Sequence, residues 1–261
     1  MSRINDVDLA FVVDTTGSMG GFIAAAQRQM TGMIEEVARA ADVSVRVAVV
    51  QYRDHPPQDT LVYQVAPFSA DLAEAKRAIG SLRAGGGGDG PEAVLDGIVA
   101  ACGKLEWQRH SRRLAILVGD APPHGAGGPG DGFPKGCPCG QTIESATALA
   151  EETRVTFYAL GLTPYAKDSF TRLARLTGGE YFDSAQGEQA IQRVNQLLAV
   201  EFGHLELDQA VLDEWNENAD FSIDAAALKL GRMCGEVATS VARLSARRLI
   251  GPGTRAVVGQ T

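Results

Sequence analysis

The stretch Asp8–Gly20, which reads DLAFVVDTTGSMG, decides the fold. Its first half, from Leu9 to Val13, is apolar at every position and rich in β-branched and aromatic residues, which favours a strand. A strand without polar alternation is typical of the centre of a parallel sheet that helices cover on both faces. The chain is therefore expected to begin with a buried core strand that ends at Asp14.

Oxygen-bearing side chains follow this strand at once. Asp14, Thr16 and Ser18 lie at alternate positions, and in an open α/β sheet ligands bind at the carboxyl ends of the strands. One carboxylate and two hydroxyls are hard oxygen ligands, which suit Mg²⁺ or Mn²⁺ and, less often, Ca²⁺. The alternative is a turn in which Thr16 or Ser18 caps the next helix without any metal.

Length and charge narrow the class of protein. The 261 residues suffice for one large α/β domain or for a domain with an appendage. A net charge of −8 without a basic stripe argues against nucleic-acid binding. Because neither a signal peptide nor a membrane span is visible, we expect a cytoplasmic protein without membrane contact, whose four cysteines are reduced. The oligomeric state stays open.

Short apolar runs alternate along the chain with segments whose apolar residues recur every three or four positions. This alternation predicts an α/β fold that is Rossmann-like and doubly wound, with a mostly parallel six-stranded sheet and helices on both faces. After the first strand, the expected strands are 43–52, 60–65 (at an edge, antiparallel to its predecessor), 114–119, 155–160 and 181–182, and the expected helices are 20–41, 71–82, one that begins at Pro91, 142–152, 168–176 and 188–202.

Two further segments bring acids to the edge where the first strand ends. The segment Gly85–Glu92, GGGGDGPE, lacks the Gly-Lys-Ser/Thr ending of a phosphate loop. Its acids Asp89 and Glu92 would repel a phosphate but attract a cation. The strand 114–119 ends at Asp120, just as the first strand ends at Asp14.

These motifs together resemble the von Willebrand factor A family. The D-x-T-x-S string at Asp14–Ser18 is similar to the first motif of its metal ion-dependent adhesion site. RVAVVQYRD at Arg46–Asp54 and LAILVGD at Leu114–Asp120 are similar to further core strands, so the resemblance covers Asp6 to about Phe202. The closest likeness is to the domain attached to the von Willebrand factor A alpha-kinases, which carry similar YRD, GGGDGPEA and DAPPHG stretches.

The resemblance implies a metal site, with one departure from the usual pattern. Most members supply a Thr from the loop before the third helix, whereas this chain has Asp89 and Glu92 there, as in the integrin beta-subunit version. That version puts Glu92 on the ion and Asp89 on it or on a neighbouring ion. The implied metal ligands are Asp14, Thr16, Ser18, Asp89, Glu92 and Asp120, and the implied ion is Mg²⁺, or else Mn²⁺ or Ca²⁺.

The family implies a non-enzymatic protein-interaction module with an adaptor or regulatory role. The ion would keep an open position that an Asp or Glu of a protein partner fills. The alternative is a haloacid dehalogenase-like, Mg²⁺-dependent phosphotransferase with Asp14 as nucleophile. Two features count against it, because His124 stands where that pattern wants an acid, and Lys76 and Lys104 lie on helices rather than on a loop.

A cysteine pair stands out in the long loop Ala121–Gly140. Cys137 and Cys139 form a C-x-C string, and zinc binding there would need further ligands. His124, Asp131 or Cys102 could supply them; the alternative is two reduced thiols. By contrast, His55 and His124 are expected to be exposed loop histidines. Asp54 could support the rim of the metal site, but it is expected to lie in a surface turn.

The resemblance divides the chain into a von Willebrand factor A-like domain over residues 1–203 and a C-terminal helical extension over 204–261. The extension is expected to hold a short helix near 205–215 and a longer one over 223–244. The apolar stripe of the longer helix is expected to pack on the domain. The tail from Gly251 is expected to be disordered.

Overall fold

The computed structural model describes residues 4–39, 44–183 and 187–251. A six-stranded sheet has the strand order β3-β2-β1-β4-β5-β6. β2 and β3 pair antiparallel, whereas β5 pairs parallel with both β4 and β6. The strands are β1 (Asp6–Asp14), β2 (Ser44–Tyr52), β3 (Tyr63–Ser69), β4 (Arg112–Gly119), β5 (Thr156–Gly161) and β6 (Tyr181–Asp183).

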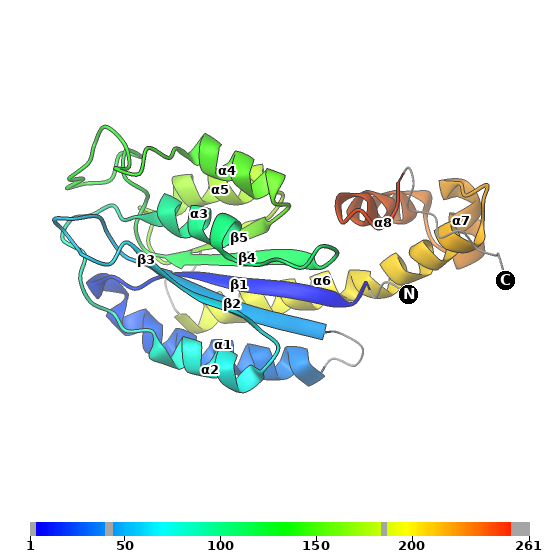
Figure 1. The fold of residues 1–261 in the computed structure, drawn as a ribbon, viewed down its shortest axis with the longest axis horizontal. Helices are drawn as coiled ribbons and strands as arrows, with labels where there is room; N and C mark the ends of the chain where they lie inside the picture. The colour runs from blue at the N-terminus through cyan, green and yellow to red at the C-terminus, as the bar shows by residue number, and fades with distance from the viewer. Residues whose placement is uncertain (1–3, 40–43, 184–186, 252–261) are drawn as a thin grey trace. The chain divides into compact units, whose positions relative to one another are not determined.

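Helices cover both faces of this sheet, with α3, α4 and α5 on one side and α1 and α2 on the other (Figure 1). This arrangement confirms the predicted doubly wound, mostly parallel fold. The helices are α1 (Gly20–Arg39), preceded by the 3₁₀ turn η1 (Gly17–Met19), α2 (Leu72–Ser81), α3 (Val94–Lys104), α4 (Ile143–Glu152), α5 (Lys167–Leu176), α6 (Gly187–Glu217), α7 (Ile223–Leu230) and α8 (Cys234–Ala246).

The central position of β1 explains why its sequence is apolar at every position. All its residues after Asp6 are buried, and Val12 packs with Tyr52 and Leu95 in the core under α3. Even Asp8 is buried, and its two carboxylate oxygens accept hydrogen bonds from Arg46, both at 2.9 Å. With β2 and β4 on either side, the loops that leave the ends of these three strands meet around Asp14.

The third strand begins later than the sequence pattern predicts. β3 covers Tyr63–Ser69 rather than residues 60–65, although its antiparallel pairing with β2 is as expected. The preceding segment turns first, because Gln58 and Asp59 both donate their backbone N–H groups to the carbonyl of His55. Two prolines in this turn, which lack N–H groups, delay the start of the ladder.

The chain forms two compact units, whose limits differ from the expected boundary after residue 203. The larger unit comprises residues 7–107 and 113–195, and the smaller one comprises 1–6, 108–112 and 196–261. The smaller unit takes the segment 108–112 because the buried guanidinium of Arg247 donates to the carbonyls of His110, at 2.9 Å, and Ile4, at 2.6 Å.

The helices of the smaller unit differ from the prediction in two ways. α6 continues to Glu217, so the separate short helix expected near 205–215 does not exist. The helix expected over 223–244 is broken into α7 and α8 at Gly231, which adopts a left-handed conformation with φ of 63° and ends α7.

The apolar stripe of α7 and α8 has a different partner from the one expected. It is buried against Val211 and Leu212 of α6 and against Ile4, with Val237 and Leu244 fully buried at the centre of the cluster. Among the described residues, the sheet contributes none to this cluster. The tail beyond Gly251 lies outside the described residues, and none of the helices within them is long and apolar enough to cross a bilayer.

Candidate metal centre

The turn after β1 holds three oxygen-bearing side chains close together. Thr16 donates both its backbone N–H, at 2.8 Å, and its hydroxyl, at 2.6 Å, to Oδ1 of Asp14. The hydroxyl of Ser18 lies 3.3 Å from that of Thr16. The second carboxylate oxygen of Asp14 is buried and has no hydrogen-bond partner in the described part of the chain.

The glycine run brings Glu92 to this turn. Gly85 and Gly17 tie the two loops together, since Gly85 donates to the carbonyl of Thr15 and Gly17 donates to that of Gly86. Gly87 has a φ of 75°, and a Cβ built on it would lie 3.0 Å from Oε1 of Glu92 and 3.2 Å from the side chain of Thr16. The glycine is therefore needed both for its backbone conformation and for the close approach of these two side chains.

The end of β4 completes this group of oxygens. A Cβ built on Gly119 would lie 3.3 Å from the Cβ of Asp14, so the two strand ends are in close contact. Asp120 follows at once and is 9 % exposed. Its Oδ1 and Oε2 of Glu92 are buried and, among the described residues, have no hydrogen-bond partner.

The carboxylates of this cluster repel one another. Burial raises the pKa of Asp14 from 3.8 to about 7; hydrogen bonds from Thr16 counteract this, and the charges of Asp120 and Asp54 add to it. Burial and then the charges of four other acids raise the pKa of Glu92 from 4.5 to about 10. A buried cluster of acids with free oxygens and adjacent hydroxyls fits a hard divalent cation, which would satisfy those oxygens and offset the repulsion.

Asp89 lies in a neighbouring group with Asp54 and His124, and its Oδ1 is buried and has no hydrogen-bond partner among the described residues. Its Oδ2 accepts hydrogen bonds from the backbone of Gly132, at 2.6 Å, and from Gln58, at 3.3 Å. Ligand atoms of Asp89, Asp54 and His124 all lie within 4.8 Å of one another. Of the two positions that the resemblance allows for Asp89, the geometry favours the neighbouring ion.

Asp54 and His124 were wrongly expected at the surface. Asp54 is fully buried and His124 is 3 % exposed, and Nε2 of His124 lies 2.7 Å from Oδ1 of Asp54. Burial lowers the pKa of His124, but hydrogen bonds to Asp54 and Asp131 outweigh it, so the pKa is raised overall. The signal that could have found Asp54 is its place directly after a core strand, which is also the place of Asp14 and Asp120.

The three residues considered as further zinc ligands, His124, Asp131 and Cys102, do not lie with Cys137 and Cys139 in the cluster of ligand atoms. His124 and Asp131 pair with each other at 3.0 Å. Cys102 lies on α3 in the core, where burial raises the pKa of its thiol to about 12. His55, expected to be exposed, is instead 7 % exposed, and its Nε2 lies 3.1 Å from Sγ of Cys137.

Comparison with known proteins agrees with this fold. Residues 8–114 match the model of a family described as the von Willebrand factor A domain. The solved structure of von Willebrand factor type A from Catenulispora acidiphila is 17 % identical, with a TM-score of 0.54, over 74 % of this chain and 41 % of that one. The chain contains a von Willebrand factor A domain.

Another similar structure of this fold is proximal thread matrix protein 1 from the mussel byssus, with a zinc-occupied MIDAS motif, the metal ion-dependent adhesion site. It is 16 % identical, with a TM-score of 0.56, over 76 % of this chain and 46 % of that one. Identity at this level shows a shared fold. The von Willebrand factor A domain of this chain therefore has a structural neighbour in which a divalent metal binds.

Two longer relatives contain sequence similar to this chain. The alpha-protein kinase vwkA of Dictyostelium discoideum is 28 % identical over 155 residues, 58 % of this chain and 24 % of the kinase. A putative ariadne-like RING finger protein, R811, of Acanthamoeba polyphaga mimivirus is 27 % identical over 202 residues, 74 % of this chain and 20 % of that protein. The chain thus spans about a quarter or less of the relatives it matches.

Proposed function

We propose that this von Willebrand factor A domain is a metal-dependent protein-interaction module. Asp14, Thr16, Ser18, Glu92 and Asp120 would hold one Mg²⁺-type ion, and Asp89 would serve a neighbouring ion with Asp54. The observation that carries the proposal is the set of buried, unpaired oxygens on Asp14, Glu92 and Asp120 beside two hydroxyls. Such a site leaves the octahedral ion an open position.

The open position would accept a carboxylate from an Asp or Glu of a protein partner. The ion would supply electrostatic attraction for that carboxylate, which the acidic site alone would repel. The family and its interaction role support an adaptor or regulatory function. None of the four cysteines forms a disulfide, which supports a reducing compartment such as the cytoplasm.

The first test is calorimetric titration of the whole chain with Mg²⁺ or Mn²⁺. We expect about one site of this kind per chain, and its loss in the double variant Asp14→Ala with Ser18→Ala. Glu151→Ala, which removes an exposed acid from α4, is the control and should bind the ion as the wild type does. If the double variant binds as tightly as the wild type, the site is misplaced.

The second test separates interaction from catalysis. Partner capture should depend on Mg²⁺, and both a chelator and Asp14→Ala should abolish it. Mg²⁺-dependent hydrolysis of p-nitrophenyl phosphate that disappears in Asp14→Asn would instead support the phosphotransferase. Lys76, one of the two lysines considered for that role, pairs with Glu35 on α1, which argues against it as a phosphate ligand.

A further inference from the structure

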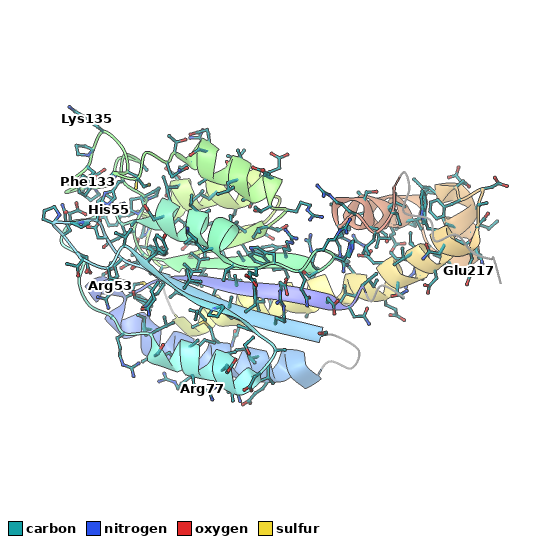
Figure 2. The ribbon with its side chains drawn as sticks, viewed as in Figure 1. Arg53, His55, Arg77, Phe133, Lys135 and Glu217 are labelled. Atoms are coloured by element: carbon teal, nitrogen blue, oxygen red, sulfur yellow. The ribbon has the colours of Figure 1, made fainter. Side chains whose placement is uncertain are left out.

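A second cluster of ligating side chains lies at the same end of the sheet as the acidic site. It consists of His55 after β2, Asp96 in the first turn of α3, and Cys137 and Cys139 in the long loop after β4. Figure 2 shows His55 and Phe133 beside one another at this end, with Lys135 at the outer edge of the loop. Four donors from three separate segments thus converge at one point.

The distances within this cluster are short. Nε2 of His55 lies 3.0 Å from Oδ2 of Asp96 and 3.1 Å from Sγ of Cys137. Sγ of Cys137 lies 3.1 Å from the same Asp96 oxygen and 2.9 Å from Sγ of Cys139, and all four ligand atoms lie within 4.8 Å of one another. Donors of a tetrahedral zinc ion with bonds of about 2.0–2.3 Å stand roughly 3.3–3.8 Å apart, a spacing that this cluster reaches with small side-chain shifts.

The chemistry of the donors matches zinc better than it matches a hydrogen-bonded cluster. Two sulfurs, an imidazole nitrogen and a carboxylate oxygen are ligands that zinc takes in proteins, and four of them make a closed tetrahedral site. Without an ion, the buried Asp96 carboxylate would be shared between the imidazole of His55 and the thiol of Cys137, and a thiol is a weak donor. The acidic site, with oxygen ligands only, suits a harder ion, so the two sites differ in metal preference.

A zinc ion at this cluster would stabilise the long loop after β4. Residues 121–141 contain no helix and no strand longer than a single bridge. The turn Cys137–Gly140 is closed by a hydrogen bond of 2.9 Å from the N–H of Gly140 to the carbonyl of Cys137, which brings both thiols to the same side. Phe133 packs edge-on against His55 and His124 at ring-centroid distances of 6.1 and 4.9 Å.

We propose that His55, Asp96, Cys137 and Cys139 bind one zinc ion, which clamps the loop of residues 121–141 onto the ends of β2 and α3. This structural site is distinct from the acidic site and does not depend on the interaction function proposed above. Two residues of the clamped loop also belong to the neighbouring acidic group. The backbone N–H of Gly132 donates a hydrogen bond to Asp89, and His124 pairs with Asp54. It lines a cleft of about 640 Å³ with residues of α4 and α5.

Metal analysis of the whole chain tests the proposal. The protein is reconstituted with Zn²⁺ under reducing conditions, and zinc that survives gel filtration is counted. We expect one tightly held zinc per chain in the wild type, and an affinity that falls more than about 100-fold in Cys137→Ser with Cys139→Ser, since a structural ligand pair is lost. Cys234→Ser, an exposed thiol elsewhere, is the control and should keep the zinc.

The acidic site must be excluded as the source of the zinc. The variant Asp14→Ala with Ser18→Ala should retain the tightly held zinc. Retention in the cysteine variant with loss from the acidic variant would overturn the proposal. A disulfide between Cys137 and Cys139 in freshly purified protein would overturn it as well; alkylation in denaturant with a chelator, which frees any zinc-bound thiols, would show it as two missing thiols.

Two readouts do not require the cysteine variant to fold. Replacing the zinc of the wild type by Co²⁺ should give thiolate-to-cobalt charge-transfer absorption and the visible bands of a tetrahedral site, and their absence would contradict the proposal. Zinc should also slow tryptic cleavage after the exposed Lys135 at least about tenfold relative to chelator-treated protein. Equal cleavage rates would show that no ion clamps the loop.

Discussion

At the scale of single residues, Asp14 and Glu92 should make ion binding dependent on pH. Burial raises their pKa values to about 7 and about 10, whereas a bound cation requires ionised carboxylates. Binding must therefore release protons, and affinity for Mg²⁺ should rise with pH up to about pH 10, most steeply below about pH 7. Calorimetric titration in buffers with different ionisation enthalpies measures the protons released, and Asp14→Asn should release fewer.

The same two groups determine how stability varies with pH when no divalent ion is present. Each binds a proton more tightly in the folded than in the unfolded chain, where the pKa values are about 3.8 and 4.5. Their contribution to the free energy of unfolding therefore falls as pH rises from those values toward about 7 and about 10. Saturating Mg²⁺ should remove this fall in stability with pH. Urea unfolding at several pH values, with and without the ion, measures it, and the same pH dependence in both conditions would contradict the prediction.

A second prediction at this scale concerns the two acids of the glycine loop. Glu92→Gln should weaken ion binding more than Asp89→Asn, because Glu92 lies beside Thr16 and carries the repulsion of Asp14 and Asp120. Asp89 instead accepts a hydrogen bond from Gly132, 43 residues away. Titration of both variants with Mg²⁺ decides the order, and the reverse order would mean that the integrin-like pattern does not apply to this loop.

The proximity of the site residues could be predicted from the sequence for some of them and not for others. Asp14 and Asp120 follow apolar runs, and parallel strands bring their carboxyl ends to one edge, so the proximity of these acids could be predicted. His55, Asp96 and Cys137 are separated by 41 residues at each step and belong to a turn, a helix and a loop. Their meeting depends on how the loop folds back, which periodicity does not encode.

At the scale of elements, the glycine loop should be sensitive at Gly87. Gly87→Ala places a left-handed backbone under strain and pushes a methyl group toward Glu92 and Thr16, at 3.0 and 3.2 Å. Gly127→Ala is the matched control, because Gly127 has a similar φ of 88° but nothing within 4 Å of the position that a Cβ would take. Both variants should lose about 1 kcal/mol of stability.

Only Gly87→Ala should also lose affinity for Mg²⁺, by about tenfold or more if the methyl group displaces the Glu92 carboxylate by a fraction of an ångström. Urea unfolding and calorimetric titration of the two variants separate the backbone effect from the contact effect. An equal loss of affinity in both variants would mean that loop strain, rather than contact with Glu92, controls the site.

The limits of helices and strands could be predicted where residues that end such elements follow them directly, and less well where no such residue is present. The core strands end at acids or at a glycine, so their limits were close to those observed. The division near residue 203 was placed where the family resemblance ends, and no helix ends there, because Gly203 lies inside α6 and a single glycine is tolerated within a helix. Gly231 does end α7, because the chain turns there with a left-handed residue.

At the scale of the whole molecule, the two compact units predict that stability and ion binding can be separated. All six expected metal ligands belong to the larger unit, whereas the apolar stripe of α7 and α8 is buried in the smaller one. Leu244 is fully buried there, so Leu244→Ala should cost about 2–5 kcal/mol of the free energy of unfolding of that unit. The ion affinity of the larger unit should stay unchanged.

Leu228→Ala is the control for this prediction, because Leu228 lies on α7 in the same unit but is 87 % exposed. It should change stability by less than about 0.5 kcal/mol. Differential scanning calorimetry with and without Mg²⁺ would show the separation as a lowered transition in Leu244→Ala that Mg²⁺ does not restore, together with a second transition that the ion still raises. If Leu244→Ala instead weakens ion binding in proportion to its loss of stability, the two units fold as one cooperative body, and the helical extension supports the metal site directly.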